Sequence, residues 1–120
     1  MSFCYINGSY KNNIDALISV QDRGFNFSDG VYEVMGFRKG KLLNFKKHLN
    51  RLSKSLIDLQ ISAPFSNQNS LKIIIYHLLK LNDVNDGFLY LQITRGTAKR
   101  NHLFPSNIKP NVVIFTFSKG

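Results

Sequence analysis

Hydrophobic and polar residues alternate along residues 31–38, and this period of two predicts a β-strand with two different faces. One face is mostly apolar, and the other begins with a phenol and contains a glycine. The two faces comprise Val31, Glu33, Met35 and Phe37 and, opposite them, Tyr32, Val34, Gly36 and Arg38. The glycine could leave room for a ligand on its face, or it could mark a β-bulge in an ordinary strand.

The segment before this strand, residues 21–30, carries two glycines and several short polar side chains. Gly24 and Gly30 permit backbone conformations that other residues avoid, and side chains such as Asp22 and Asp29 can hydrogen-bond the backbone locally. We therefore expect an irregular loop that presents side chains at the mouth of the strand.

Two dipeptides predict tight hairpins, because asparagine or lysine followed by glycine suits a two-residue turn. Asn7-Gly8 would join strands at 3–6 and 9–11, and Lys39-Gly40 would join the strand at 31–38 to a short one at 41–43. In the connection between these hairpins, residues 17–20 are apolar enough to form a further short strand.

The spacing of apolar residues then changes to three and four, which predicts two helices. The first would span residues 45–60, with the Asn44 side chain as its N-cap. The second would end near Leu81, with Asn67 or Asn69 as its cap. The two apolar stripes are formed by Phe45, Leu49, Leu52, Leu56 and Leu59 and by Leu71, Ile74, Ile75, Leu78 and Leu79.

Strands return at 88–94 and 112–117, separated by a long loop over 95–110 that contains two prolines. Along 88–94, leucine and isoleucine alternate with polar residues, so one face should lie under the helices and the other should carry Tyr90, Gln92 and Thr94. Long ordered loops in a compact domain are more often functional than idle.

The order of four strands, two helices and two strands predicts an α+β fold. We expect a two-layer sandwich with a mostly antiparallel sheet and both helices packed on one of its faces. Residues 1–120 should form a single domain, since the length and the 43% hydrophobic content suit one core.

The formal net charge of +9 raises nucleic acid as a partner, but the basic residues are scattered along the chain and accompany no nucleic-acid-binding motif. We therefore predict no nucleic-acid partner, although the charge could attract small anions into a cleft. No apolar run is long enough for a membrane span and the start lacks a signal-peptide pattern, which predicts a cytoplasmic protein away from membranes. The single cysteine, Cys4, is expected to be a buried thiol.

Few residues could carry chemistry. Arg51 borders the apolar stripe of the first helix, where it could hold a phosphate or simply extend from the core edge to solvent, with His48 one turn earlier. Arg100 and His102 alternate in the long loop, so that with Tyr32 they could form a carboxylate-binding trio. No metal-ligand spacing, nucleophile motif or phosphate-binding glycine loop is present.

Three motifs together resemble the amino-terminal domain of class IV (fold type IV) aminotransferases that use pyridoxal 5'-phosphate, and among these the D-amino acid aminotransferases. The likeness runs in order from about Tyr5 to Phe117, and three motifs in register are far more specific than one. The motifs are Asp22-Arg-Gly-Phe-x-Phe-x-Asp-Gly-Val-Tyr-Glu33, His48-Leu-Asn-Arg-Leu52 and Gln92-Ile-Thr-Arg-Gly-Thr-Ala-Lys-Arg-Asn-His102.

The resemblance implies a role for each of five residues. Arg51 would contact the cofactor phosphate, and Tyr32 would bind the α-carboxylate of the substrate. Arg100 and His102 would join the same carboxylate trap, reaching across the interface of a homodimer, and Val34 would line the side-chain pocket. The Arg-x-His pair favours D-amino acid enzymes over branched-chain aminotransferases and aminodeoxychorismate lyases, which share the fold.

The implied reaction transfers an amino group from a D-amino acid to a 2-oxo acid through pyridoxal 5'-phosphate. In such enzymes the Schiff-base lysine belongs to a second domain, and no lysine of this chain occupies its motif position. We expect the interdomain connection to begin near Gly120, the lysine-bearing domain to be absent, and the chain alone to contain no catalytic residue and to be inactive. The missing domain could be supplied in cis or in trans. Two alternatives from other functional classes are a non-catalytic docking subunit and a basic anion-binding module.

Overall fold

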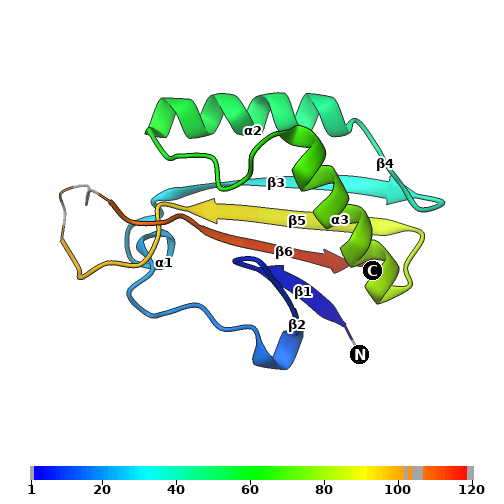
Figure 1. The fold of residues 1–120 in the computed structure, drawn as a ribbon, viewed down its shortest axis with the longest axis horizontal. Coiled ribbons are helices and arrows are strands. Elements are labelled where there is room, and N and C mark those ends of the chain that lie inside the picture. The colour runs from blue at the N-terminus through cyan, green and yellow to red at the C-terminus, as the bar shows by residue number, and fades with distance from the viewer. Residues whose placement is uncertain (1, 102, 104–106, 119–120) are drawn as a thin grey trace.

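The computed structural model describes residues 2–101, 103 and 107–118, which form one six-stranded sheet with helices on one face (Figure 1). All paired strands are antiparallel, and their order across the sheet is β2-β1-β6-β5-β3-β4. This architecture confirms the predicted α+β fold. The strands are β1 (Phe3–Ile6), β2 (Ser9–Asn12), β3 (Gly30–Arg38), β4 (Lys41–Leu42), β5 (Gly87–Thr94) and β6 (Asn111–Phe117).

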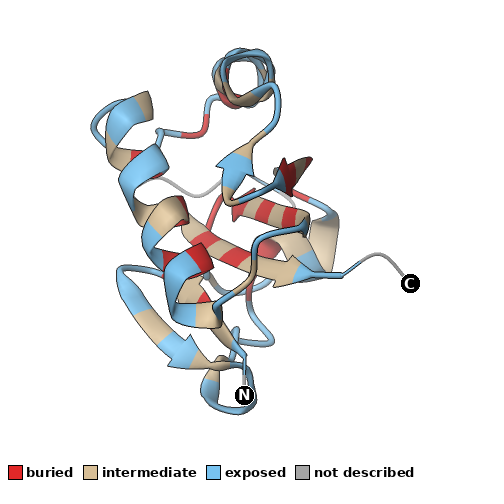
Figure 2. Cartoon of the chain, turned by 90° about the vertical axis from the view of Figure 1, so that its right-hand side faces the viewer, coloured by how far each residue is buried: buried red, intermediate tan, exposed pale blue. Residues whose placement is uncertain are grey.

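The centre of the sheet is formed by β3, β5 and β6 in regular register. Tyr32 lies opposite Gln92, and Gln92 lies opposite Val113 on the next strand. Gly36 pairs with Phe88 within the same unbroken ladder, so β3 has no bulge at this glycine. The two faces of β3 are those that the alternation predicts, since buried and less buried residues alternate along it. Figure 2 shows alternation of this kind as red and tan bands along strands of the sheet.

Two helices of equal length cover one face of the sheet: α2 (Phe45–Leu59) and α3 (Gln68–Asn82). Their bounds agree with the predicted ranges to within a residue. The core between helices and sheet consists of fully buried aliphatic side chains from both layers, among them Met35, Leu49, Leu52, Leu71, Ile75, Leu78, Leu89, Leu91, Ile93 and Ile114. Cys4 is a buried free thiol, and burial raises its pKa.

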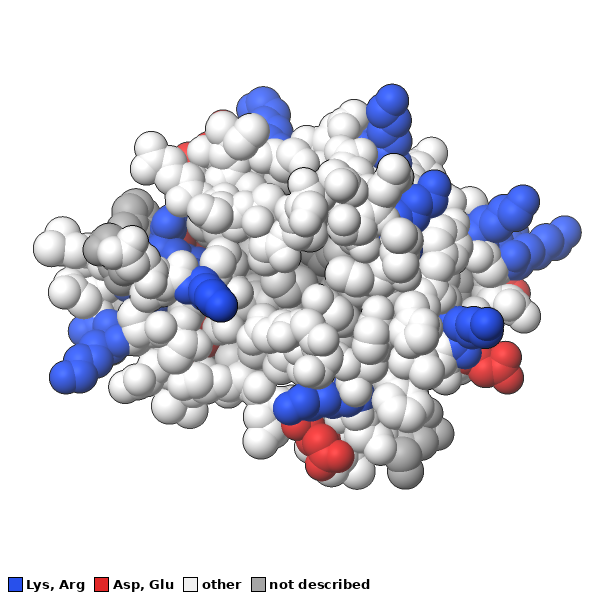
Figure 3. Space-filling model, viewed as in Figure 1, with Lys and Arg blue, Asp and Glu red and all other residues white. Residues whose placement is uncertain are grey.

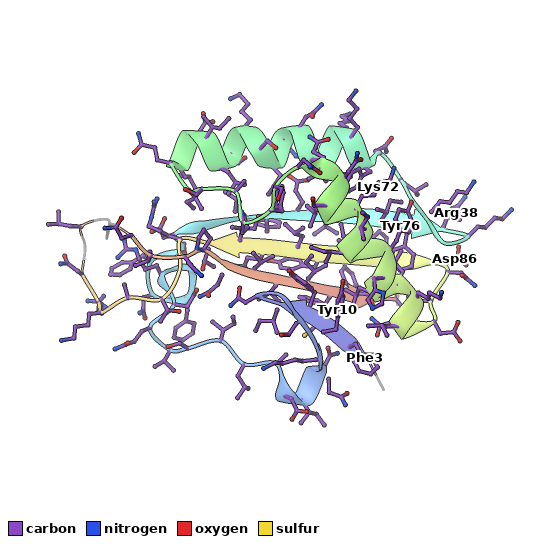
Figure 4. All side chains as sticks on the ribbon, viewed as in Figure 1. Phe3, Tyr10, Arg38, Lys72, Tyr76 and Asp86 are labelled. Atoms are coloured by element: carbon purple, nitrogen blue, oxygen red, sulfur yellow. The ribbon has the colours of Figure 1, made fainter. Side chains whose placement is uncertain are left out.

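Two phenols connect α3 with the edges of the sheet (Figure 4). Tyr10 on β2 donates a hydrogen bond to the carbonyl of Ile74 at 3.3 Å. At the opposite edge, the backbone N–H of Leu42 on β4 donates to the Tyr76 hydroxyl at 3.2 Å. Both edge strands are therefore held by the helix layer as well as by their neighbouring strands.

The predicted cap of α3 is confirmed and that of α2 is wrong. Asn67 accepts a hydrogen bond from the Ser70 N–H at 2.8 Å, as an N-cap should. Asn44 instead adopts a left-handed conformation with φ of 56°, and its side chain caps nothing. Asparagine tolerates this conformation, which turns the chain sharply from β4 into the helix.

Two predictions for the segment between the hairpins are also wrong. Residues 17–20 form no strand, and Leu17 and Val20 are exposed; a one-turn 3-10 helix (η1, Asn13–Asp15) precedes them. The expected irregular loop at 21–30 contains a short helix, α1 (Arg23–Phe27), whose N-cap is the Asp22 side chain. Four residues without a neighbouring strand gain no ladder hydrogen bonds, so apolar composition alone does not make a strand there.

Basic side chains stand mostly apart from one another on the face shown in Figure 3, which agrees with their scattered positions in the sequence. Within the described residues, no helix has both the length and the apolar character needed to cross a bilayer.

The two isoleucines of α3 test the assignment of its faces. Ile75 is fully buried and Ile73 is 70% exposed. Replacing Ile75 with alanine should lower the free energy of unfolding by about 2–5 kcal/mol, because it leaves a cavity in the core. Ile73→Ala should change it by less than about 0.5 kcal/mol. Chemical denaturation of both variants measures the difference, and similar losses would contradict the assigned faces.

Candidate functional site

A buried carboxylate lies between β3 and α2 and is bound by two side chains of the helix. Arg51 donates through Nε to Glu33 Oε2 at 2.9 Å and through Nη2 to Glu33 Oε1 at 2.8 Å. The Nδ1 atom of His48 lies 2.8 Å from Glu33 Oε1. Because an ionised carboxylate only accepts, His48 must carry its proton on Nδ1, and its 3.4 Å distance from Arg51 Nη2 is then a contact between two donors.

The sequence builds this cluster from two periodicities. His48 and Arg51 are three residues apart and therefore share one side of α2, next to the apolar stripe. Glu33 belongs to the face of β3 that the helices cover, among apolar neighbours. Burial alone would raise the pKa of Glu33, but the hydrogen bonds and charges of Arg51 and His48 outweigh it and hold that pKa below its ordinary value.

One edge of the Arg51 guanidinium binds Glu33, and the remainder of the group is open to solvent. Its side chain is 65% exposed although Glu33 binds two of its nitrogens. Within the part of the chain that the structure describes, its third nitrogen, Nη1, donates no hydrogen bond to another residue. A guanidinium fixed in this way can offer its remaining N–H groups to an anion such as a phosphate.

Sequence reasoning predicted Arg51 and named His48 as a neighbour, but it assigned no role to Glu33. A signal was present: Glu33 is the only glutamate of the chain, and it falls in the apolar set of an alternating strand. A carboxylate on the covered face of a sheet requires a charged or hydrogen-bonding partner there. Arg51 and His48, one turn apart on the helix that covers this face, are the partners of Glu33.

Tyr32 and Val34 lie on the other face of β3, which among the described residues is covered by neither α2 nor α3. Tyr32 is 64% exposed, and its ring stacks on Tyr90 of the neighbouring strand with centroids 5.7 Å apart. Tyr90 in turn stacks on Phe115 of β6 at 5.0 Å. Three strands thus contribute one row of rings, and the phenol of Tyr32 ends that row on β3.

Arg100 lies in the loop after β5, with its guanidinium carbon 5.1 Å from the centre of the Phe27 ring. His102 lies outside the described residues. Within the described residues, no contact between Arg100 and Tyr32 is recorded, so the carboxylate-binding trio stays a prediction. Arg100 is paired instead with an aromatic residue of α1, which sequence reasoning did not single out.

A second buried carboxylate, Asp29, lies just before β3 and is shared by two arginines. Its Oδ2 atom accepts from Arg23 Nε at 2.8 Å and from Arg95 Nε at 2.7 Å, and all three side chains are buried. Burial alone would raise the pKa of Asp29, but the hydrogen bonds and charges of Arg95 and Arg23 hold it below its ordinary value.

The two arginines extend this contact to distant segments. Arg95 donates to the carbonyls of Leu59 at 2.7 Å and Gln60 at 3.2 Å, at the C-terminal end of α2. Arg23 donates through Nη1 to the carbonyl of Asn101 at 2.6 Å, one residue after Arg100. The end of the Arg51 helix and the Arg100 loop are therefore both attached to the Asp29 carboxylate.

Asp22 organises the remaining part of this end of the sheet. Its Oδ2 accepts from the Phe25 N–H at 3.0 Å and so caps α1. Its Oδ1 accepts from Thr94 Oγ1 at 2.5 Å and from Asn111 Nδ2 at 2.7 Å, which joins α1 to β5 and β6. A Cβ atom at Gly24 would collide with the Thr94 side chain, so this helix needs glycine there.

Removing the charge of Asp29 should destabilise the protein strongly. Asp29→Asn leaves two buried guanidinium groups without their anion, and we expect a loss of about 3–5 kcal/mol in the free energy of unfolding. Asp58→Asn is the matched control, because Asp58 is exposed and pairs with Lys54 on the surface; it should cost less than about 0.5 kcal/mol. Urea denaturation at neutral pH compares the two, and equal losses would refute the structural role of Asp29.

Acidification should reveal the contribution of Glu33. Its pKa is lowered from an ordinary value of 4.5, so its stabilising effect is complete above that value and is lost as the pH falls through the lowered pKa. The stability advantage of the wild type over Glu33→Gln should therefore be complete at neutral pH and shrink as the pH falls below 4.5. Thermal unfolding at stepped pH measures it, with Asp58→Asn expected to follow the wild-type profile; a constant advantage would contradict the prediction.

Comparison with known proteins places these residues in a family. A family model described as amino-transferase class IV matches residues 30–119. D-alanine aminotransferase from Staphylococcus epidermidis is 38% identical over 119 residues, which are 98% of this chain and 42% of that protein. D-alanine aminotransferase from Bacillus licheniformis is 38% identical over 111 residues, which are 92% of this chain and 39% of the relative.

Solved structures show the same fold. The branched-chain amino acid aminotransferase of Escherichia coli superposes with a TM-score of 0.91 at 17% identity, over 99% of this chain and 40% of that one. The 4-amino-4-deoxychorismate lyase of Pseudomonas aeruginosa gives a TM-score of 0.75 at 23% identity, over 98% of this chain and 40% of that one. The family model and the two D-alanine aminotransferases show that this chain belongs to the class IV aminotransferase family.

Proposed function

We propose that this chain forms the part of a D-amino acid aminotransferase that binds the phosphate of pyridoxal 5'-phosphate and the carboxylate of the substrate. The overall reaction would move an amino group from a D-amino acid to a 2-oxo acid in the cytoplasm. The observation that carries the proposal is the Arg51 guanidinium, which Glu33 orients from behind and which remains 65% exposed.

The residues around Arg51 fit a phosphate group. A planar guanidinium with a free edge matches two phosphate oxygens, and the buried Glu33 prevents the side chain from turning away. When bound, pyridoxal 5'-phosphate supplies the electron sink that makes the Cα–H bond of an amino acid acidic. The contribution of Arg51 is to hold that group by its phosphate.

The open sheet face would bind the substrate. The Tyr32 hydroxyl can donate a hydrogen bond to the α-carboxylate, and Val34, next but one on the same face, would line the side-chain pocket. Arg100 and His102 would complete the carboxylate trap, with the loop that carries them reaching the site of a second copy in a homodimer. The fixed positive charge of Arg100 complements a carboxylate as Tyr32 alone cannot.

Two related activities remain alternatives within the family. Branched-chain aminotransferases and aminodeoxychorismate lyases share the fold, but the structures compared are only 17% and 23% identical to this chain and support no more than that fold. The relatives at 38% identity are D-alanine aminotransferases, and this favours D-amino acid substrates. Transamination of D-alanine but not of L-leucine by an enzyme containing this chain would decide the question.

Catalysis would also require the lysine that attaches the cofactor, which the family resemblance assigns to a second domain. That domain could be supplied in cis or in trans.

The uncovered sheet face, with Tyr32, Val34 and Phe117 exposed, favours a docking role as the second candidate function. In that case the isolated chain should self-associate through this face, and Tyr32→Ser with Phe117→Ser should weaken the association measured by sedimentation velocity.

Phosphate recognition can be tested without covalent chemistry. Pyridoxamine 5'-phosphate lacks the aldehyde that would react with surface lysines, so NMR titration reports only reversible binding. We expect shifts around Arg51 that disappear in Arg51→Gln and with pyridoxamine, which has no phosphate. Arg38→Gln, at the far end of β3, should bind as the wild type does. Equal binding by Arg51→Gln would reject Arg51 as the phosphate ligand.

The isolated 120-residue chain should be inactive, because none of its lysines occupies the motif position of the cofactor-binding lysine. Incubation with pyridoxal 5'-phosphate, D-alanine and 2-oxoglutarate should give no pyruvate above a protein-free control. A complete D-alanine aminotransferase serves as the positive control. Pyruvate formed in proportion to the concentration of this chain would overturn the expectation.

A further inference from the structure

The Phe27 ring at the end of α1 lies next to two arginines. The guanidinium carbon of Arg23 is 4.6 Å from the ring centre, and that of Arg100 is 5.1 Å from it. Arg23 is buried, whereas Arg100 is exposed. One aromatic side chain thus contacts both a buried structural arginine and an exposed arginine of the candidate carboxylate site, and each contact lies within the range of a cation–π interaction.

The ring has a fixed position. Phe27 follows Arg23 by four residues on a helix, so the two side chains are neighbours on its surface. Arg23 is itself held by Asp29 at 2.8 Å, and Asp22 caps the start of the same helix. The side of Phe27 that contacts Arg23 therefore rests on a group that cannot move without breaking a buried ion pair.

The backbone that carries Arg100 is also held. Arg23 donates to the carbonyl of Asn101 at 2.6 Å, so the residue directly after Arg100 is attached to the same buried arginine. Beyond this anchor, an exposed arginine side chain has four rotatable bonds and many accessible conformations. Within the described residues, the group that contacts the Arg100 guanidinium is the Phe27 ring.

We propose that Phe27 is the positioning residue of Arg100, and that it holds this guanidinium in place before a carboxylate binds. The inference rests on the proposed carboxylate-binding function of Arg100. An arginine that meets a ring through its planar face keeps its in-plane N–H groups available, so the same guanidinium can contact the ring and a carboxylate together. Preorganisation of this kind raises affinity, because less conformational freedom is lost on binding.

NMR of the arginine Nε–Hε groups and the adjacent Hδ protons tests this position directly. In the wild type, the Arg100 Hδ resonances should be shifted upfield by the ring relative to those of the exposed Arg38, with Arg100→Lys providing the assignment. Phe27→Leu should remove this shift and Phe27→Tyr should retain it. Phe25→Leu is the matched control, because Phe25 lies on the same helix and is 75% exposed; it should leave Arg100 unchanged.

Two outcomes of these NMR measurements would overturn the proposal. One is that Phe27→Leu moves the Arg23 resonances alone, since the ring would then serve only the buried arginine. If Phe27→Leu does not fold, the wild type decides: nuclear Overhauser contacts between the Phe27 ring and the Arg100 Hδ protons support the proposal, and their absence is the second adverse outcome.

Titration with D-alanine separates this inference from the function on which it rests. Loss of an exposed cation–π contact should weaken D-alanine binding, followed at Arg100, by about two- to fivefold in Phe27→Leu. Unchanged affinity would overturn preorganisation by Phe27. If D-alanine affects Arg100 in no variant while the ring shift persists, the position of Arg100 stands and the carboxylate-binding function fails.

Discussion

The structure depends most on the carboxylate of Asp29, which two buried guanidinium groups share. One anion cannot neutralise two cations, and the excess positive charge is met by backbone carbonyls of Leu59, Gln60 and Asn101. Charge-assisted bonds of this kind are stronger than those between neutral groups, and in a buried site the loss of one partner exposes the others to the full cost of desolvation. The cluster therefore requires all of its members.

The same arrangement occurs at Glu33, with a different outcome. There too a buried carboxylate binds an arginine, but Arg51 keeps one side in solvent. Asp29 fixes arginines that serve the fold, while Glu33 fixes an arginine that can still bind an anion. The difference lies in the nitrogens that the carboxylate does not bind. In Arg23 and Arg95 these nitrogens donate to backbone carbonyls, whereas in Arg51 they face solvent. The two buried arginines and the exposed Arg51 are thus held in the same way, each by a buried carboxylate.

Periodicity alone was enough to predict the sheet faces, both long helices and the positions of Tyr32 and Arg51, because these features depend on burial along a regular element. It could not predict α1, whose five residues are stabilised by contacts of Asp22 with Thr94 and Asn111, far away in sequence. The role of Arg95 was hidden for the same reason. Arg95 begins the long loop after β5, and only the folded chain brings it to Asp29 and the end of α2.

Arg51 and Arg100 belong to segments that meet at the Asp29 cluster. Arg95 holds the last carbonyls of the helix that carries Arg51, and Arg23 holds the carbonyl next to Arg100. The backbone positions from which these two side chains extend are therefore held relative to each other by one buried cluster. A change at the Asp29 cluster would therefore displace both segments together, which makes the end of the Arg51 helix and the start of the Arg100 loop one coupled unit.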